Sequence, residues 1–262
     1  MHDSEVAMDI TRPRERGGPV RLTYVGHSTV VVEMSGIRLV TDPILRPRVA
    51  HLRRTAPEAT VTAPIDCVLV SHAHMDHLDP RSIALLPGDP VIVVPCGAAR
   101  HVRNRRVIEV AEGNQVDIGA LTLQATHAEH DGRRYAVGPS RPSLGFRIVG
   151  DRSIYFAGDT GLFAGMADIG RSGIDVALLP VAGWGSRLPP GHLGPHTAAR
   201  ALQPLAPHVA VPIHWGTLSP IAAGRKRRRN GLSAAEAFAT HAAAAAPQVS
   251  VVVLPPGGTL EL

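Results

Sequence analysis

Short apolar runs bounded by glycine-containing turns recur along most of this chain. Runs of four to seven residues rich in valine, isoleucine and leucine are typical of strands. They predict strands at Val20–Val25, Thr29–Met34, Ile37–Thr41, Asp66–Ser71, Val91–Val94, Val107–Val110, Gln115–Ile118, Leu121–Thr126, Leu144–Val149, Ser153–Ala157 and Val209–Ile213. Residues 43–64 are rich in proline and arginine and show no period, which predicts a long loop.

Helices are expected between the later strands, at Pro80–Leu86, Leu162–Arg171, Pro195–Leu205 and Ser233–Ala246. The last begins with Ser233 three residues before Glu236, the spacing of a capping box. This alternation predicts an α/β sandwich with its loops gathered at one edge. No repeat or linker divides the chain, so we expect an N-terminal tail at residues 1–18 and one domain at residues 19–262.

Composition narrows the class of protein. The chain has 262 residues, of which 44% are hydrophobic, and this content excludes a disordered protein. No apolar run approaches the roughly 20 residues of a membrane span, and residues 1–16 lack the apolar core of a secretory signal. We therefore expect a cytoplasmic protein without a transmembrane segment. Cys67 and Cys96 stand in apolar stretches and are expected to be buried thiols.

Basic residues exceed acidic ones, with 27 Lys and Arg against 22 Asp and Glu, a net charge of +5. This balance favours a small anionic substrate or another anionic partner. Aromatic residues are only 3% of the chain, which argues against a base-stacking platform, so no stable nucleic-acid partner is expected. The dense run Arg225–Arg229 must be solvated, and it either attracts an anionic substrate or surface or serves solubility alone. Association into a homo-oligomer is left open.

A cluster of metal-ligating residue types follows the strand Asp66–Ser71 directly. The sequence His-x-His-x-Asp-His places His72, His74, Asp76 and His77 within six residues. Two histidines at i and i+2 of an extended segment point to the same side, so both can reach one ion. Asp76 and His77 can reach a second ion from the turn that follows. Imidazole and carboxylate together suit Zn, Mn or Fe better than Ca or Mg.

One segment cannot complete two metal sites, so further ligands must come from other strand ends. Asp159 follows a strand and stands between two glycines; its alternative role is to cap the helix that follows. His214 follows another strand, and its alternative role is that of a core histidine. The strand Leu121–Thr126 is followed by two candidates, His127 and His130.

These motifs in this order resemble the metallo-β-lactamase superfamily of binuclear metal hydrolases. The similarity runs from about Leu22 to Gly216. It is closest to a branch that contains N-acyl-phosphatidylethanolamine phospholipase D and L-ascorbate-6-phosphate lactonase. The segments that carry this narrower resemblance are Tyr24–Val32, Thr41-Asp42-Pro43, Pro64–Asp79 and His214–Thr217.

The resemblance implies a four-layer αβ/βα sandwich, with two mixed β-sheets flanked by helices and two metal ions at one edge. It implies that His72, His74 and a later histidine bind the first ion. For the second ion it implies Asp76, His77 and His214, with Asp159 bridging the two. Zinc is the expected metal, with manganese or iron as alternatives.

The spacing of that branch, Thr-Pro-Ala-x-His, favours His130 as the later ligand, with His127 a neighbour that contacts substrate. His27, in Gly26-His27-Ser28, is expected beside the metals as a ligand support, a substrate contact or a structural turn. Asp42 either orients a ligand histidine or forms an Asx turn. His192 matches a branch histidine facing the pocket, as a proton donor or substrate contact, or else only enters the following helix. The remaining histidines, such as His51, His101, His196 and His241, are expected on the surface.

Hydrolysis is the predicted reaction, with a hydroxide shared by two divalent ions as nucleophile. Asp76 would hold and orient this hydroxide, and His192 would protonate or bind the leaving group. The resemblance and the basic balance favour a phosphodiester or another anionic phosphate-containing substrate. A sugar-phosphate lactone or other cyclic ester is the alternative, and nucleic-acid processing ranks below both.

Overall fold

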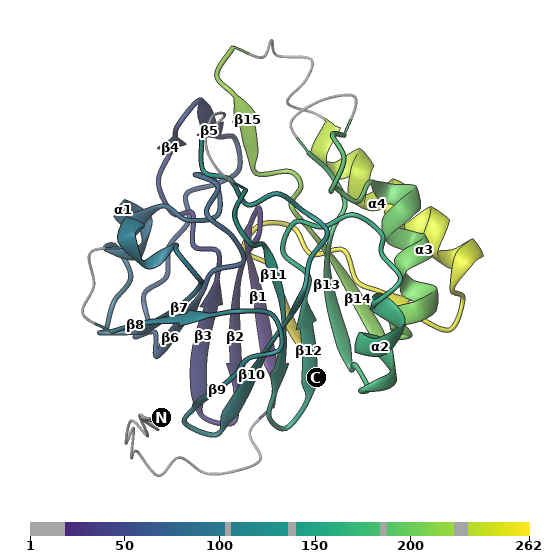
Figure 1. Ribbon diagram of the computed structural model, residues 1–262. Coiled ribbons are helices and arrows are strands. Elements are labelled where there is room, and N and C mark those ends of the chain that lie inside the picture. The colour runs from purple at the N-terminus through teal and green to yellow at the C-terminus, as the bar shows by residue number, and fades with distance from the viewer. Residues whose placement is uncertain (1–18, 103–105, 136–139, 184–187, 223–229) are drawn as a thin grey trace.

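Two seven-stranded mixed sheets face each other at the centre of the molecule (Figure 1). This computed structural model describes residues 19–102, 106–135, 140–183, 188–222 and 230–262, with the side chains of 230–233 left out. The predicted tail at residues 1–18 and the basic run Arg225–Arg229 lie outside the described residues. Among the residues described, no helix is long and apolar enough to cross a bilayer.

The first sheet has the order β17-β1-β2-β3-β6-β7-β8. Its strands are β1 (Arg21–Gly26), β2 (Thr29–Met34), β3 (Ile37–Thr41), β6 (Cys67–Leu69), β7 (Val91–Pro95), β8 (Val107–Val110) and β17 (Thr259–Glu261). β1, β2 and β3 form an antiparallel meander, whereas β3, β6, β7 and β8 run parallel. The meander and the parallel strands were predicted, and β17 was missed because a three-residue strand leaves too little pattern to detect.

The second sheet has the order β16-β14-β13-β12-β11-β10-β9. Its strands are β9 (Gln115–Ile118), β10 (Leu121–His127), β11 (Leu144–Val149), β12 (Ser153–Phe156), β13 (Val176–Pro180), β14 (Val209–Ile213) and β16 (Ser250–Val251). β9 to β12 are antiparallel, and β12, β13 and β14 are parallel. β13 and β16 were not among the predicted strands.

A third, small sheet corrects the expectation of an unstructured loop at residues 43–64. β4 (Arg48–Val49) and β5 (Leu52–Arg54) form a hairpin, and β5 also pairs with β15 (Leu218–Pro220). Strands of two or three residues show no period of their own. The partner of β5 lies far away in the sequence, so only the tertiary structure creates this pairing.

Three of the four predicted helices are shorter than predicted or begin at a different residue. The described helices are α1 (Pro80–Ile83), the 3₁₀ helix η1 (Ala99–His101), α2 (Met166–Arg171), α3 (Pro195–Leu205) and α4 (Asn230–Ala245). Only α3 matches its predicted bounds. α4 begins before Ser233, so the predicted capping box is wrong; residues at i and i+3 share a face anywhere along a helix, which makes this spacing ambiguous.

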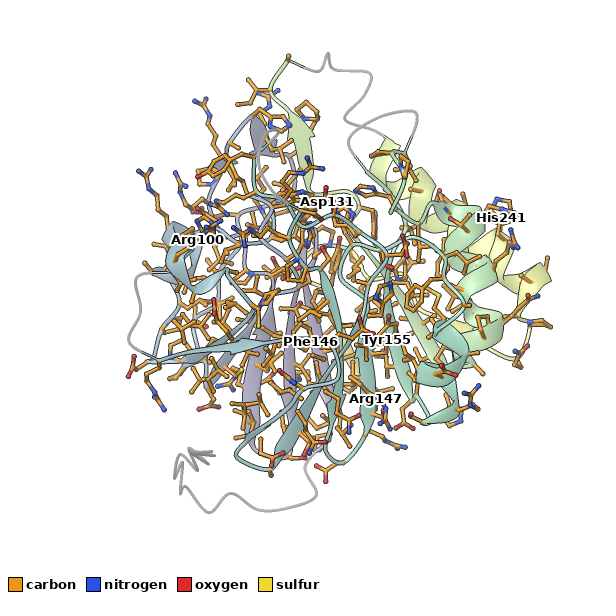
Figure 2. The ribbon with its side chains drawn as sticks, in the orientation of Figure 1. Arg100, Asp131, Phe146, Arg147, Tyr155 and His241 are labelled. Carbon is orange, nitrogen blue, oxygen red and sulfur yellow. The ribbon has the colours of Figure 1, made fainter. Side chains whose placement is uncertain are left out.

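Side chains at alternating positions along the strands of the first sheet point into two separate hydrophobic cores. Val30 and Val32 of β2 face the second sheet and join the central core, whereas Val31 faces the other way. On the outer side Val68, Ile92 and their neighbours pack with Ile83 of α1. α2, α3 and α4 cover the outer face of the second sheet, and Phe146 and Tyr155 lie within its strands (Figure 2). The predicted four-layer αβ/βα sandwich is therefore confirmed.

The two cysteines differ in exposure. Cys67 is fully buried in β6, and burial raises the pKa of its thiol above the ordinary range. Cys96 is exposed, which corrects the prediction that both thiols are buried. β7 ends at Pro95, so Cys96 already belongs to the turn that follows the apolar run.

Strand direction gathers several loops at one edge of the sandwich. β3 runs parallel to β6, and β1 does too because two antiparallel steps separate it from β3. For the same reason β10 runs parallel to β12. The carboxyl ends of these strands and of β14 therefore lie at the same edge, the upper one in Figure 1. The candidate metal ligands follow these ends.

Candidate metal centre

Six strand ends deliver side chains to this edge. His27 follows β1, Asp42 follows β3, the His72–His77 segment follows β6, His130 follows β10, Asp159 follows β12 and His214 follows β14. Two glycines make the close approach of these loops feasible. A Cβ at Gly26 would lie 2.6 Å from Thr217 Oγ1, and a Cβ at Gly158 would lie 2.6 Å from Ser71 Cβ.

The first cluster consists of His72, His74 and His130, each of which contributes one ring nitrogen within 4.8 Å of the other two. His72 Nε2 is 2.8 Å and His130 Nε2 is 3.2 Å from His74 Nδ1. The structure thus brings His130, and not His127, to the two histidines of the motif, as the spacing predicted.

In His72 and His130, the outer ring nitrogen, which faces away from the cluster, carries the proton. The inner nitrogen, which faces into the cluster, therefore presents a lone pair. His130 Nδ1 donates to the carbonyl oxygen of Gly191 at 2.9 Å. Ser71 Oγ uses its proton on Asp42, so it accepts from His72 Nδ1 at 2.9 Å. The Nε2 lone pairs of His72 and His130 therefore both point at His74 Nδ1, which can donate to only one of them. A cation between the three nitrogens relieves this repulsion, so the cluster fits a divalent ion.

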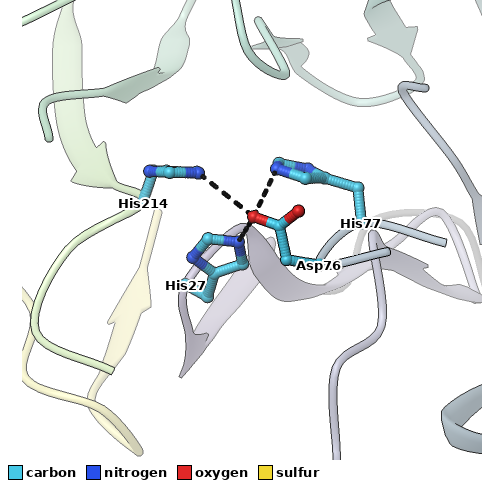
Figure 3. Close-up of side chains that lie close together, drawn as sticks. All are labelled: His27, Asp76, His77 and His214. Atoms are coloured by element: carbon cyan, nitrogen blue, oxygen red, sulfur yellow. Dashed lines mark ion pairs between the residues drawn. The ribbon is translucent and has the colours of Figure 1, made fainter. Parts of the chain in front are cut away.

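The second cluster consists of His27, Asp76, His77 and His214 (Figure 3), and its three histidines are buried. Asp76 Oδ2 lies 3.3 Å from His27 Nε2, 3.6 Å from His77 Nε2 and 4.0 Å from His214 Nε2. The outer nitrogen of His214 donates to the carbonyl oxygen of Ala182 at 2.8 Å, which turns its Nε2 toward the carboxylate. This donor set of imidazole and carboxylate also suits a transition metal ion.

Asp159 lies between the second cluster and His192. One carboxylate oxygen is 3.4 Å from His214 Nε2, and the other is 3.4 Å from His77 Nε2 and 3.5 Å from His192 Nε2. Together with His130 and His192 it forms a further group of close donor atoms. Asp159 therefore stands where the resemblance implies a bridging ligand.

Asp42 supports the centre without reaching into it. Its carboxylate accepts hydrogen bonds from Ser71 N at 2.7 Å, Ser71 Oγ at 2.6 Å and His77 Nδ1 at 2.6 Å. Of the two roles left open for Asp42, the structure shows the one in which it orients a motif histidine. Such a partner fixes the tautomer of an imidazole and raises its basicity.

Burial keeps most imidazoles of the centre neutral. Burial, followed by the neighbouring imidazoles, lowers the pKa of His72 well below its ordinary value and also lowers the pKa of His74. Burial lowers the pKa of His130 to about 4 and that of His214 to about 3, despite the nearby carboxylate of Asp159. Neutral imidazole is the form that binds metal ions.

His77, Asp76 and Asp159 instead favour their charged forms. Burial alone would lower the pKa of His77, but the carboxylates of Asp159, Asp76 and Asp42 outweigh it and raise the pKa well above its ordinary value. Burial would raise the pKa of Asp159 and Asp76, yet the surrounding imidazoles hold both below the ordinary range. This concentration of negative charge favours a cation at the second cluster.

An arginine connects two of the ligand-bearing loops. Arg134 Nη1 donates to the carbonyl oxygens of Ala73 and Leu78, at 2.8 and 2.9 Å, and so spans the loop that carries Asp76 and His77. Arg134 follows His130 closely in sequence, so one side chain ties the two loops together. It was not among the predicted site residues, because an arginine that binds two carbonyl groups leaves no signal in a motif.

His127 and His192 were both expected near the metals and differ in position. The His192 side chain is 14% exposed and its ring lies 4.7 Å from that of His130. The His127 side chain is 43% exposed, and its two nitrogens lie 3.0 Å from Glu112 and 3.4 Å from Glu129. His127 thus lies outside both clusters. His241 is exposed on α4, at the helical side of the molecule, in ring contact with His196 (Figure 2).

The chain is similar to known metalloproteins. Residues 37–215 match the family model described as "Beta-lactamase superfamily domain". The chain belongs to this superfamily. A "UPF0173 metal-dependent hydrolase" of Opitutus terrae is 37% identical over 212 residues, which are 76% of this chain and 86% of that protein. At this similarity the chain is also a member of the UPF0173 metal-dependent hydrolases.

Two other comparisons also cover most of the chain. An uncharacterized protein of Mycobacterium bovis is 30% identical over 225 residues, covering 77% of this chain, which spans only 60% of that longer relative. The structure of Igni18, a metallo hydrolase of Ignicoccus hospitalis, superimposes with a TM-score of 0.70 at 26% identity. The superposition covers 94% of this chain and 99% of Igni18, so the metallo-β-lactamase fold extends over nearly the whole molecule.

Proposed function

We propose that this protein is a binuclear metal-dependent hydrolase of phosphodiesters or other anionic phosphate-containing compounds. One observation carries the hydrolase part. The outer nitrogens of His72, His77, His130 and His214 are each held by a hydrogen-bond acceptor of the fold, so that their inner nitrogens converge beside two carboxylates. A preformed set of buried imidazoles and carboxylates of this kind is costly to keep together unless a cation is bound there.

The residues divide into two sites. His72, His74 and His130 would hold one ion, and Asp76, His77 and His214 would hold the other, with Asp159 between them. Zinc is the metal we propose, because imidazole and carboxylate donors suit it. Bound divalent ions at such a pair of sites supply Lewis acidity and activate water near neutral pH.

The remaining side chains position protons and substrate. His192 lies 3.5 Å from Asp159 and reaches the same space as His130, so a proton on its ring is placed to be given to a leaving oxygen. Pro189 and Pro190 carbonyl oxygens lie 3.3 Å from its Nδ1 and restrict the ring. Asp76 would help to hold and orient the attacking water. His127, at the exposed rim, remains a proposed substrate contact.

A group of arginines around His101 supports an anionic substrate. Arg100 Nε lies 3.3 Å from His101 Nε2, and burial, then Arg134, Arg100 and Arg141, lowers the pKa of His101. None of these three guanidinium groups forms an ion pair with a carboxylate among the described residues. Arg141 also pairs its carbonyl oxygen with Gly132, where an added Cβ would lie 3.1 Å from His72 Cβ. Positive charge therefore accumulates around His101, and Arg134 extends it to the loop that carries Asp76 and His77.

Metal analysis and a substrate panel test this proposal. The purified protein should contain close to two ions per chain and hydrolyse bis(p-nitrophenyl) phosphate. Removal of the ions with a chelator should abolish turnover, and zinc should restore it. His74→Ala and Asp159→Ala should each lose at least one ion and most of the activity, whereas Asp117→Asn, on the exposed edge strand β9, should retain both.

The panel also separates the substrate classes. Faster turnover of phosphodiesters than of phosphomonoesters and lactones would support the proposal, and a lactone as the best substrate would replace it with the lactonase alternative. Activity confined to RNA or DNA would indicate nucleic-acid processing. Full turnover by the metal-free protein would refute the metal-dependent mechanism itself.

A further inference from the structure

We propose that His27 is a protein donor to the ion of the second cluster, so that this ion is enclosed by protein while the ion of the first cluster keeps an open position. The inference deepens the proposed function and rests on it in so far as both clusters bind ions. It assigns His27 to the metal rather than to substrate.

The distances match the first requirement of a donor. For metal–nitrogen bonds of about 2.0–2.1 Å, tetrahedral geometry separates neighbouring donor atoms by about 3.3–3.4 Å. His27 Nε2 lies 3.3 Å from Asp76 Oδ2, closer to it than the nitrogens of His77 and His214 at 3.6 and 4.0 Å. Figure 3 shows the three rings directed at one carboxylate oxygen. By position, His27 is as well placed as the two implied ligands.

The surroundings of His27 exclude easy access for a substrate. Its side chain is 2% exposed, against 13% for Asp76. Its ring packs between two members of the cluster, with centroids 4.1 Å from His214 and 5.0 Å from His77. A group that contacts substrate must be reachable from solvent, whereas a ligand of an enclosed ion need not be. Burial therefore favours the metal over substrate as the partner of this ring.

The backbone holds His27 in place at a conformational cost. Its φ is 57°, and that of His214 is 62°, both in the left-handed region that residues with a side chain rarely adopt. The two residues are joined directly, because His214 N donates to the carbonyl oxygen of His27 at 2.6 Å. His27 N in turn donates to Thr217 Oγ1 at 2.8 Å. Strain of this kind persists where the surrounding structure requires a particular side-chain position.

Donor number then distinguishes the two ions. The first cluster offers three imidazoles, the number typical of sites that leave a position for water or substrate. The second cluster offers four donors with His27, before Asp159 is counted. The ion of the first cluster is thus the one with room for an incoming ligand.

The test uses His27→Asn and His27→Gly, because both residues tolerate a positive φ and retain the backbone hydrogen bonds to Thr217 and His214. His127→Asn is the matched control: it removes an imidazole that lies outside both clusters. Binding of zinc is measured by competition with a chromophoric chelator. The coordination of bound Co(II) is followed by its visible absorption, which strengthens as the coordination number falls from five or six to four.

In both His27 variants we expect one ion to bind with wild-type affinity and the other about 10- to 100-fold more weakly. The Co(II) absorption of the weaker site should change, and free imidazole should restore it in His27→Gly. His127→Asn should bind both ions with the wild-type spectrum. Unchanged affinity and spectrum in the His27 variants would overturn the inference, as would an equal loss in His127→Asn. Failure of the wild-type protein to bind two ions would instead refute the proposed function.

Discussion

Asp42→Asn is the substitution that most directly tests how the centre is held in place. Asp42 is fully buried and adopts a φ of 32°, which asparagine tolerates better than alanine does. The substitution keeps the volume of the side chain and removes its charge and one acceptor atom. The three donors around it, Ser71 N, Ser71 Oγ and His77 Nδ1, remain in place.

The magnitude follows from counting these donors. An amide oxygen can occupy the position of Oδ1, which serves Ser71 N, or of Oδ2, which serves Ser71 Oγ and His77 Nδ1. In either orientation the amide NH₂ group faces at least one donor. A buried donor left without an acceptor costs about 1–3 kcal/mol, and a hydrogen bond to a charged group contributes about 1.5–3 kcal/mol. Burial raises the pKa of Asp42, which shows that the buried charge itself has a cost and limits the loss. We expect about 2–4 kcal/mol of destabilisation from these two effects.

Urea unfolding of the metal-free protein measures this free energy without a contribution from bound ions. Competition for zinc, measured on the folded variant, tests the second effect. We expect the affinity for one ion to fall roughly 10-fold or more, because His77 loses its anionic partner. Asp117→Asn is the control, since its carboxylate accepts from Thr122 Oγ1 on the exposed edge and should change stability by less than about 0.5 kcal/mol. An Asp42→Asn protein as stable as this control, with unaltered zinc affinity, would refute the reasoning.

Three further predictions concern other parts of the molecule. His130→Ala should lose one ion in elemental analysis while His127→Ala retains both, and the reverse result would move the ligand. Ala206, which ends α3 with a φ of 44°, should tolerate glycine with a gain of about 0.5–1 kcal/mol in urea unfolding, because the left-handed strain is relieved; a loss would contradict this. Burial raises the pKa of Tyr24 and Tyr155, so their contribution to stability is complete below about pH 10 and falls as pH rises toward the folded pKa. Alkaline absorbance should show both phenols ionising only as the protein unfolds, and ionisation near the ordinary pKa of tyrosine in the folded state would contradict this.

Local sequence determined the strands that carry the centre and most of its chemistry. Apolar runs bounded by turns predicted β1, β2 and β3, and the runs are continuous because each strand buries side chains in two cores. The His-x-His-x-Asp-His motif is contiguous, so its four donors are brought together by one turn of chain. Asp159 and His214 were predictable because a polar side chain at the end of a buried strand is costly unless it binds a ligand or a backbone group.

Tertiary structure decided the features that depend on distant partners. β5 pairs with β15 across more than half of the chain, and neither strand is long enough to show a pattern. His27 reaches the second cluster only because β1 ends beside β14, where its carbonyl oxygen accepts from His214 N. Arg134 acts on carbonyl groups, which every residue possesses, so no motif can mark its targets. Residue types predict which chemistry a chain can perform, whereas the packing of its strands decides which atoms come within bonding distance.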